Sequence, residues 1–196
     1  MKHLKISIKI AIFFVIVCGL IYPLCLTGVG QAAMHNKANG SLIYVNDKVV
    51  GSALVGQEFN NPKFFTGRPS TINYDCSHNE NGEVPSTGDV TYGPNSQALK
   101  TSVNKAIDKF LKENPTIKRE DLPADLFTES ASGLDPDISL KAAQIQVDRV
   151  SKNTGISKEE LNKFIMESKE KMSPEGTVLI NVLDLNLNVA KTLKLI

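Results

Sequence analysis

The chain has 196 residues, which is room for one ordinary domain and a short additional segment. Basic and acidic residues nearly cancel at a formal net charge of +1, and we see no basic patch or stripe of the kind that binds nucleic acid. A disulfide framework is excluded, because only Cys76 among the three cysteines lies outside the apolar N-terminal run. With His78 it supplies two of the roughly four ligands of a zinc site, so no metal site is predicted.

Residues 10–30 form an uncharged run that, as a helix, is long enough to cross the roughly 30 Å hydrocarbon core of a bilayer. Three lysines and no acidic residue precede it. The positive-inside rule therefore predicts that residues 1–9 are cytoplasmic and that residues 31–196 form an extracytoplasmic domain. A cleaved signal peptide is the alternative, although the run exceeds the usual signal core of about 7–15 residues. Both interpretations place the body outside the cytoplasm.

The first part of the body contains a predicted hairpin and a long loop. Residues 42–50 carry aromatic and β-branched residues on both sides of Asn46 and Asp47, which predicts a β-hairpin. Residues 73–96 are rich in Asn, Ser, Gly, Pro and Thr, and we expect a long polar surface loop there. Between them, Arg68 stands between a glycine and a proline, which limits its backbone freedom. Such an arginine can anchor an interface or pair with a carboxylate.

Three helices are predicted in the second half of the chain. The first spans about 96–113, where apolar residues recur at helical spacing. The second opens either at Asp135-Pro136 or at Ser139, which are alternative N-terminal caps, and it ends at Gly155. The third begins at Ser157, which opens a capping box.

Two further segments are predicted as strands. Pro123–Thr128 is expected to form a short strand, and Val178–Val189 alternates apolar residues with Asn and Asp over part of its length. This alternation is typical of a strand with one buried face. Together with the hairpin and the helices, these strands predict one compact α+β domain after a single N-terminal transmembrane helix.

Residues 130–137 (SASGLDPD) form the most distinctive stretch of the body. A strand, a Gly/Ser loop and a helix N-terminus resemble an anion-binding loop, but Asp135 and Asp137 would repel phosphate. We interpret the stretch as helix capping with acidic residues matched to the helix dipole. A contact surface for a partner protein and a cation site are the alternatives.

No catalytic residue is predicted. The sequence contains neither a phosphate-binding loop nor the nucleophile motif of serine hydrolases, and His78 is the only histidine well inside the body. Asp135 and Asp137 are an obvious carboxylate pair for acid–base catalysis, but residues two apart on a helix do not face each other. Gln146 and Arg149 lie beside the apolar stripe of the second helix and are expected to face solvent or to cap a neighbour.

Four stretches, in this order and spacing, resemble the C chain of the Kdp potassium-transporting ATPase. The Gly-Arg-Pro-Ser and Ser-Gly-Leu-Asp-Pro motifs are together highly specific. The family pattern is only partly kept at residues 93–96, and Leu140 stands where the family often has proline. The matching stretches are residues 51–70, 128–139, 142–150 and 180–189.

The resemblance implies a non-catalytic accessory subunit of a high-affinity, ATP-driven potassium uptake system in the cell membrane. Its partners would be a channel-like potassium-translocating chain and a P-type ATPase chain that takes the phosphate on an aspartate. The family's C chain is described as stabilising the complex and as a catalytic chaperone that raises the ATP affinity of the hydrolysing chain. By residue match, Gln146 is the position linked with nucleotide.

The resemblance implies no cofactor of the chain's own beyond this link to ATP, and K⁺ would be carried by the partner chains. An extracytoplasmic body would keep Gln146 from cytoplasmic ATP, so we expect a mechanical role in which the domain caps the potassium entrance. A membrane-anchored hydrolase and a solute-binding module, with residues 73–96 as a lid, are the alternatives. The motif residues expected to contact partners or to support the fold are Arg68, Ser70, Ser132, Gly133, Asp135, Pro136, Asp137 and Arg149.

Overall fold

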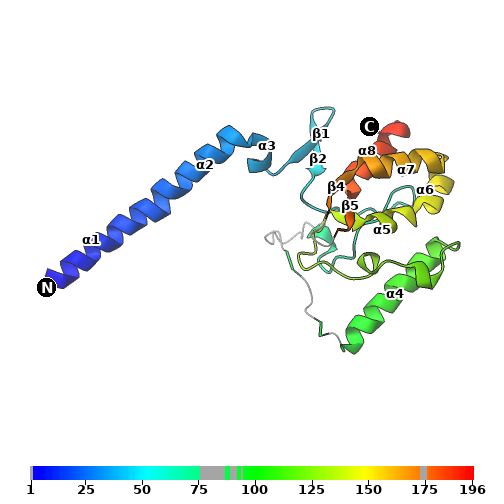
Figure 1. The fold of residues 1–196 in the computed structure, drawn as a ribbon, viewed down its shortest axis with the longest axis horizontal. Coiled ribbons are helices and arrows are strands. Elements are labelled where there is room, and N and C mark those ends of the chain that lie inside the picture. Colours follow the sequence, from blue (N-terminus) through cyan, green and yellow to red (C-terminus); the bar gives the residue numbers. More distant parts are fainter. Residues whose placement is uncertain (1, 76–86, 89–91, 94, 173–175) are drawn as a thin grey trace, which may run out of the picture. The chain divides into compact units, whose positions relative to one another are not determined.

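The computed structural model describes residues 2–75, 87–88, 92–93, 95–172 and 176–196 (Figure 1). The chain divides into two units, residues 1–42 and residues 43–196. Cys76, His78 and much of the predicted 73–96 loop lie outside the described residues.

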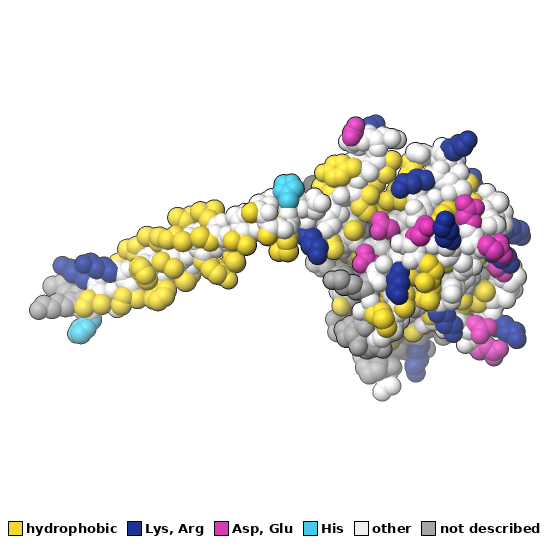
Figure 2. All heavy atoms as spheres, turned by 45° about the horizontal axis from the view of Figure 1, so that its top comes forward, with side chains coloured by type: hydrophobic (Ala, Val, Ile, Leu, Met, Phe, Trp, Pro, Cys, Tyr) yellow, Lys and Arg dark blue, Asp and Glu magenta, His cyan; other side chains and the backbone are white. Residues whose placement is uncertain are grey.

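The first unit is dominated by one uninterrupted helical run. It comprises α1 (Lys2–Ile16), a π-helical turn (Val17–Ile21) and α2 (Tyr22–Ala33), and the short helix α3 (His35–Ala38) follows. Residues 3–33 are long and apolar enough to cross a membrane, and Figure 2 shows apolar side chains along this helix with basic ones near its N-terminal end. The predicted apolar run lies within it.

The π-helical turn has a local cause in the sequence. The Tyr22 N–H donates to the Val17 carbonyl, five residues earlier, instead of four. Pro23 follows at once; it has no N–H, and its ring would clash with the carbonyl four residues before it in a regular helix. The wider turn lets the helix continue past the proline.

The hairpin at the start of the second unit is confirmed. Strands β1 (Leu42–Val45) and β2 (Lys48–Ser52) form a two-stranded sheet. Asn46 and Asp47 connect them with φ of 50° and 60°, a left-handed conformation that Asn and Asp tolerate better than other side chains.

A three-stranded antiparallel sheet with the order β3-β5-β4 lies at the centre of the second unit. Ile138 and Ile180 are paired across β3 and β5, and both are buried. Figure 1 shows α5, α6, α7 and α8 next to the sheet, and α7 packs against the other three. The elements are β3 (Asp137–Ser139), α5 (Leu140–Gln144), α6 (Val147–Thr154), α7 (Lys158–Glu167), β4 (Lys169–Met172), β5 (Val178–Asn181) and α8 (Val182–Thr192).

The predicted helix at 96–113 is confirmed as α4 (Gln97–Glu113). The Ser96 side chain caps it by accepting a hydrogen bond from the Leu99 N–H. Phe110, its one buried residue, packs edge to face on Phe127 with ring centroids 5.4 Å apart. Among the described residues, short 3₁₀ turns lie at Asn73–Asp75, Arg119–Asp121 and Ala124–Leu126.

Both late strand predictions need correction. Pro123–Thr128 is a 3₁₀ turn and not a strand, because the N–H groups of Phe127 and Thr128 both donate to the Ala124 carbonyl. The strand predicted over Val178–Val189 ends at Asn181, whose side chain accepts from the Asp184 N–H and so starts α8. Beyond that cap, buried residues recur at the spacing of a helix face, at Val182, Leu185, Asn186 and Val189. Leu183 and Ala190 are buried beside them.

The second predicted helix begins at Ser139 and is broken in two. Ser139 caps α5 by accepting from the Ala142 N–H, so Asp135-Pro136 precedes β3 and starts no helix. The helix is interrupted at Ile145 and Gln146 before α6, which ends at Gly155 with φ of 75° as predicted. Ser157 caps α7 through the Glu160 N–H, which confirms that start.

Candidate functional site

Residues 62–68, here called the connecting segment, form no strand, yet Phe65 at the middle of the segment is buried and its backbone is fully paired. Phe65 is fully buried, and its N–H donates to Asn186 Oδ1 at 2.8 Å. The Phe65 carbonyl accepts from Asn186 Nδ2 at 2.9 Å. Buried backbone groups must be paired, so the amide of Asn186 takes the place of a neighbouring strand.

Gln146 holds the next residue of the segment with every polar atom of its side chain. Its Oε1 accepts from the N–H and the hydroxyl of Thr66, each at 2.8 Å, and from Arg149 Nη2 at 2.7 Å. Its Nε2 donates to the carbonyls of Thr66 and Ala142, each at 3.1 Å. Gln146 is 0% exposed, so the expectation that it faces solvent or caps a neighbour is wrong.

Arg149 completes this cluster and is also buried, contrary to expectation. Its Nη1 donates to the carbonyls of Pro62 at 2.7 Å and Phe64 at 3.0 Å. Burial lowers the pKa of the guanidinium, and the nearby Glu113 carboxylate acts in the opposite direction. Arginine nevertheless stays charged, and here backbone carbonyls and the Gln146 amide oxygen solvate the charge.

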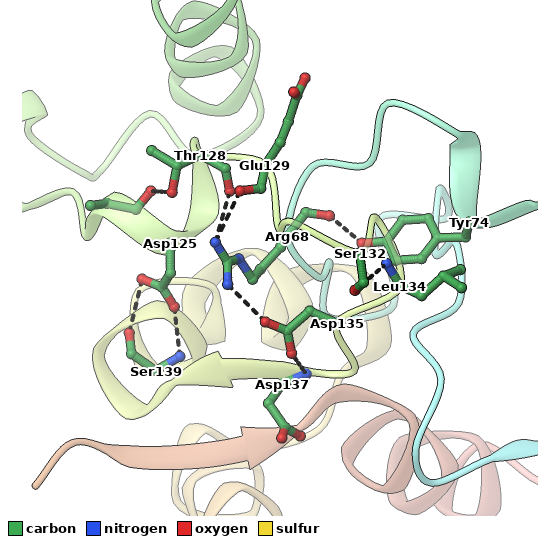
Figure 3. Close-up of polar contacts among 11 residues, drawn as sticks. Arg68, Tyr74, Asp125, Thr128, Glu129, Ser132, Leu134, Asp135, Asp137 and Ser139 are labelled. Atoms are coloured by element: carbon green, nitrogen blue, oxygen red, sulfur yellow. Dashed lines mark hydrogen bonds and ion pairs between the residues drawn. The ribbon is translucent and has the colours of Figure 1, made fainter. Parts of the chain in front are cut away.

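Arg68 joins the connecting segment to the 128–137 stretch (Figure 3). Its Nη1 donates to Asp135 Oδ2 at 2.7 Å, and its Nη2 donates to the carbonyls of Glu129 at 3.2 Å and Thr128 at 3.4 Å. The Tyr74 hydroxyl donates to the Arg68 carbonyl. Of the two roles considered for Arg68, the structure therefore shows the pairing with a carboxylate.

Two glycines allow this close packing. Gly133 has φ of 67°, and a Cβ there would come within 2.9 Å of the Gly88 carbonyl oxygen. The Gly56 N–H donates to the Leu134 carbonyl at 2.8 Å, and a Cβ on Gly56 would lie 2.5 Å from the Asp135 carbonyl oxygen. The glycine-containing stretches at 51–56 and 132–136 thus meet directly.

The remaining motif residues serve local backbone contacts. Ser70 Oγ accepts from the Tyr74 N–H at 3.0 Å, and Ser132 Oγ accepts from the Leu134 N–H at 3.1 Å. The Pro136 carbonyl accepts from the Val182 N–H at 3.0 Å. All of these residues gather around the Arg68–Asp135 pair, whereas Gln146 and Arg149 contact the earlier part of the connecting segment.

Sequence reasoning missed three polar residues of this arrangement. Asp125 accepts from the N–H and the hydroxyl of Ser139, at 2.6 and 3.1 Å (Figure 3). Asn181 and Asn186 are both buried. The two asparagines stand, with Asp184 and Asn188, in a run whose other residues are apolar. Polar residues in such a run are the signal that could have marked partners of buried backbone.

Acidic residues lie close together on the side of β3 opposite the Arg68–Asp135 pair. Burial, followed by repulsion from Asp135 and Glu170, raises the pKa of Asp137 to about 6. Burial also raises the pKa of Asp184, and Glu170 adds to the effect. Over the described parts of the chain, His, Cys, Asp and Glu form no group of three that could hold a metal ion.

A pocket of about 300 Å³ lies beside Arg68. The late part of the connecting segment forms one wall, and α4 forms another with Lys109, Phe110 and Glu113. Glu58 also lines it, so the lining combines acidic, basic and aromatic side chains.

Gln146→Leu should lower the free energy of unfolding by about 2–4 kcal/mol, because it leaves Thr66 and Arg149 with buried, unpaired donors. Chemical denaturation of the full chain in mild detergent, followed by circular dichroism, measures this loss. Gln144→Leu is the matched control, because Gln144 is exposed at the end of α5. Equal stability of the two variants would contradict the structural role assigned to Gln146.

Asp137 should make stability fall as pH rises. The folded pKa of about 6 exceeds the ordinary value of 3.8, so the folded chain holds the proton more tightly than the unfolded chain. Unfolding free energy should therefore decrease between about pH 4 and pH 6. Asp137→Asn should flatten this decrease in a denaturation series, whereas Asp121→Asn, at an exposed position, should leave it unchanged.

Comparison with known proteins agrees with the motifs around this site. The family described as "KdpC: K+-transporting ATPase, c chain" matches residues 4–191. A potassium-transporting ATPase KdpC subunit from Clostridioides difficile (strain 630) is 46% identical over 208 residues, covering 100% of both chains. One from Bacillus cereus (strain ATCC 10987 / NRS 248) is 46% identical over 191 residues, covering 95% of this chain and 94% of the relative. The chain therefore belongs to the KdpC family, the C chains of the potassium-transporting ATPase.

Proposed function

We propose that the chain is a membrane-anchored accessory subunit that holds the larger chains of the potassium-transporting ATPase together. The observation that carries this proposal is the apolar helix at residues 3–33 in a chain that belongs to the KdpC family. The proposed partners are a channel-like chain that carries K⁺ and a P-type ATPase chain that hydrolyses ATP. In this scheme the chain contributes no catalytic residue and no cofactor of its own.

The charge pattern at the N-terminus supports an orientation in the cell membrane. Lys2, Lys5 and Lys9 precede the apolar run, and no acidic residue does. Basic residues stay on the cytoplasmic side, so we place the N-terminus inside and the α+β body outside. An outer body can cap the potassium entrance of the translocating chain.

We extend the proposal to the chaperone role, in which the chain raises the ATP affinity of the hydrolysing chain. Gln146 supports an indirect route for that effect, because its amide is buried and all of its hydrogen bonds go to protein groups. A nucleotide could bond to Gln146 only after the connecting segment had moved away. The effect on ATP would then be transmitted through assembly of the complex.

The docking surface proposed for the body is the loop at residues 130–135. Ala131 and Ser132 are exposed at its tip. Arg68 and Asp135 are only 24% and 29% exposed at their side chains, so they hold the loop in shape from beneath. Charge reversal of that pair would disturb the fold itself, and an exposed position gives a cleaner test.

Ala131→Arg should reduce recovery of the two larger chains with the tagged full chain roughly tenfold, because a bulky charge at an interface commonly removes its central contacts. Detergent purification from cells that express the whole complex measures this recovery. Ala98→Arg is the control, because it makes the same change at an exposed position on α4. Normal recovery and normal growth at low potassium with Ala131→Arg would exclude the loop as the docking surface. If even the unaltered chain purified alone, a hydrolase or solute-binding module would be favoured.

The body should be accessible to protease in sealed, right-side-out vesicles, and a tag before Lys2 should be protected. This result follows from the lysines at the N-terminal side of the helix. Immunoblotting of both ends before and after detergent lysis provides the measurement. Protection of the body until lysis would place it in the cytoplasm and would overturn the proposed orientation.

A further inference from the structure

The hairpin that follows the apolar helix has an apolar outer face. Tyr44 is 61% exposed, Val49 is 54% exposed and Leu42 is 43% exposed. Ile43, Val45 and Val50 are half-buried. A hairpin with one solvated face normally alternates apolar with polar residues, and this one is apolar on both. We call Leu42, Tyr44 and Val49 the hairpin face.

The strand alternation and the turn bring the three residues of the hairpin face onto one side of the hairpin. Alternation along β1 places Leu42 and Tyr44 on the same side of the strand. A two-residue turn at Asn46 and Asp47 makes Tyr44 and Val49 cross-strand neighbours. Polar residues lie at the tip, where Lys48 follows the turn, and at the far end of β2, which is Ser52. Beyond β2, Leu54 is again apolar and is 60% exposed.

The length of the tether decides what can cover this face. Residues 34–41 separate the end of α2 from the start of β1, and α3 takes up four of them. Even fully extended, such a tether reaches at most about 30 Å, and its helical part shortens that reach. If the apolar helix spans a bilayer, the hairpin stays close to that bilayer however the body is turned. This step rests on the proposed anchoring of the chain.

The chemistry of the hairpin suits the boundary between headgroups and acyl chains. Tyr44 has an apolar ring and a polar hydroxyl, the combination that gathers at membrane interfaces. Lys37 and Lys48 lie on either side of the face along the sequence and can extend their ammonium groups to lipid phosphates. We propose that the hairpin face rests in the lipid interface, next to the anchor, as a second membrane contact.

The absence of tryptophan from the sequence gives a direct test. The full chain with Tyr44→Trp is reconstituted alone into vesicles of phosphatidylcholine and phosphatidylglycerol, with or without bromine on the acyl chains. The tryptophan fluorescence of the variant in vesicles should lie at shorter wavelength than that of the unfolded chain in denaturant. Brominated lipid should reduce the fluorescence intensity by roughly half, since interfacial elements lie about 5–10 Å into the boundary. Bromine near the headgroup should quench more than bromine near the chain end.

Three matched variants make the outcome decisive. Val49→Trp repeats the measurement on the other strand and covers a failure of Tyr44→Trp to fold. Leu20→Trp, mid-way along the apolar run, should be quenched most by deep bromine, and Met166→Trp, on α7, should not be quenched. Both positions are exposed, at 56% and 55%.

The pattern of quenching separates the inference from the proposed function. If Leu20→Trp is quenched and both hairpin variants are not, the hairpin inference is overturned and the anchor stands. If Leu20→Trp is not quenched, the anchor and the inference fall together. If the hairpin variants become shielded only when the larger chains are present, a protein partner covers the hairpin face and the lipid assignment is overturned. Quenching of Met166→Trp equal to that of the hairpin variants would also overturn the lipid assignment.

Discussion

The position of the connecting segment is set by the requirement that buried backbone N–H and C=O groups have hydrogen-bond partners. This stretch joins no sheet although Phe65 is buried in the core. Side chains from α8, from α6 and from the α5–α6 junction pair with its backbone as a neighbouring strand would. Asn186, Gln146 and Arg149 together satisfy carbonyls or N–H groups of four of its residues. An amide side chain suits this task because it donates and accepts at once, as a peptide group does.

This solution ties distant parts of the body to one another. The segment carries Arg68 to Asp135, and the 130–135 loop then closes over glycines whose lack of a Cβ permits the contact. Gln146 and Arg149 are joined by a hydrogen bond, and Arg68 and Asp135 are joined by an ion pair, so the members of each pair should respond together when one is removed. These contacts give the motif residues a structural role, and the exposed tip at Ala131 and Ser132 is the part that we propose for docking.

Electrostatics distinguish the two sides of β3. On one side, Arg68 neutralises Asp135 at 2.7 Å. On the other, Asp137 and Asp184 are partly buried near Glu170, and burial combined with like charge raises both pKa values. A cationic group that approached this side would relieve that repulsion.

The sequence by itself determined the features that arise within a few residues: the apolar helix, the Asn-Asp hairpin, α4, and the caps at Ser157 and Gly155. Spacing, turn chemistry and capping are local, so a single sequence displays them. Tertiary structure alone decided that Gln146 and Arg149 turn inward, that Arg68 pairs with Asp135, and that Asn181 ends a strand and starts a helix. In the first two cases the partners lie between 67 and 87 residues apart along the chain. Local periodicity carries no information about a partner at that distance. Near Asn181 the apolar residues fit both the spacing of a strand and that of a helix, and only packing in the folded domain determines which of the two forms.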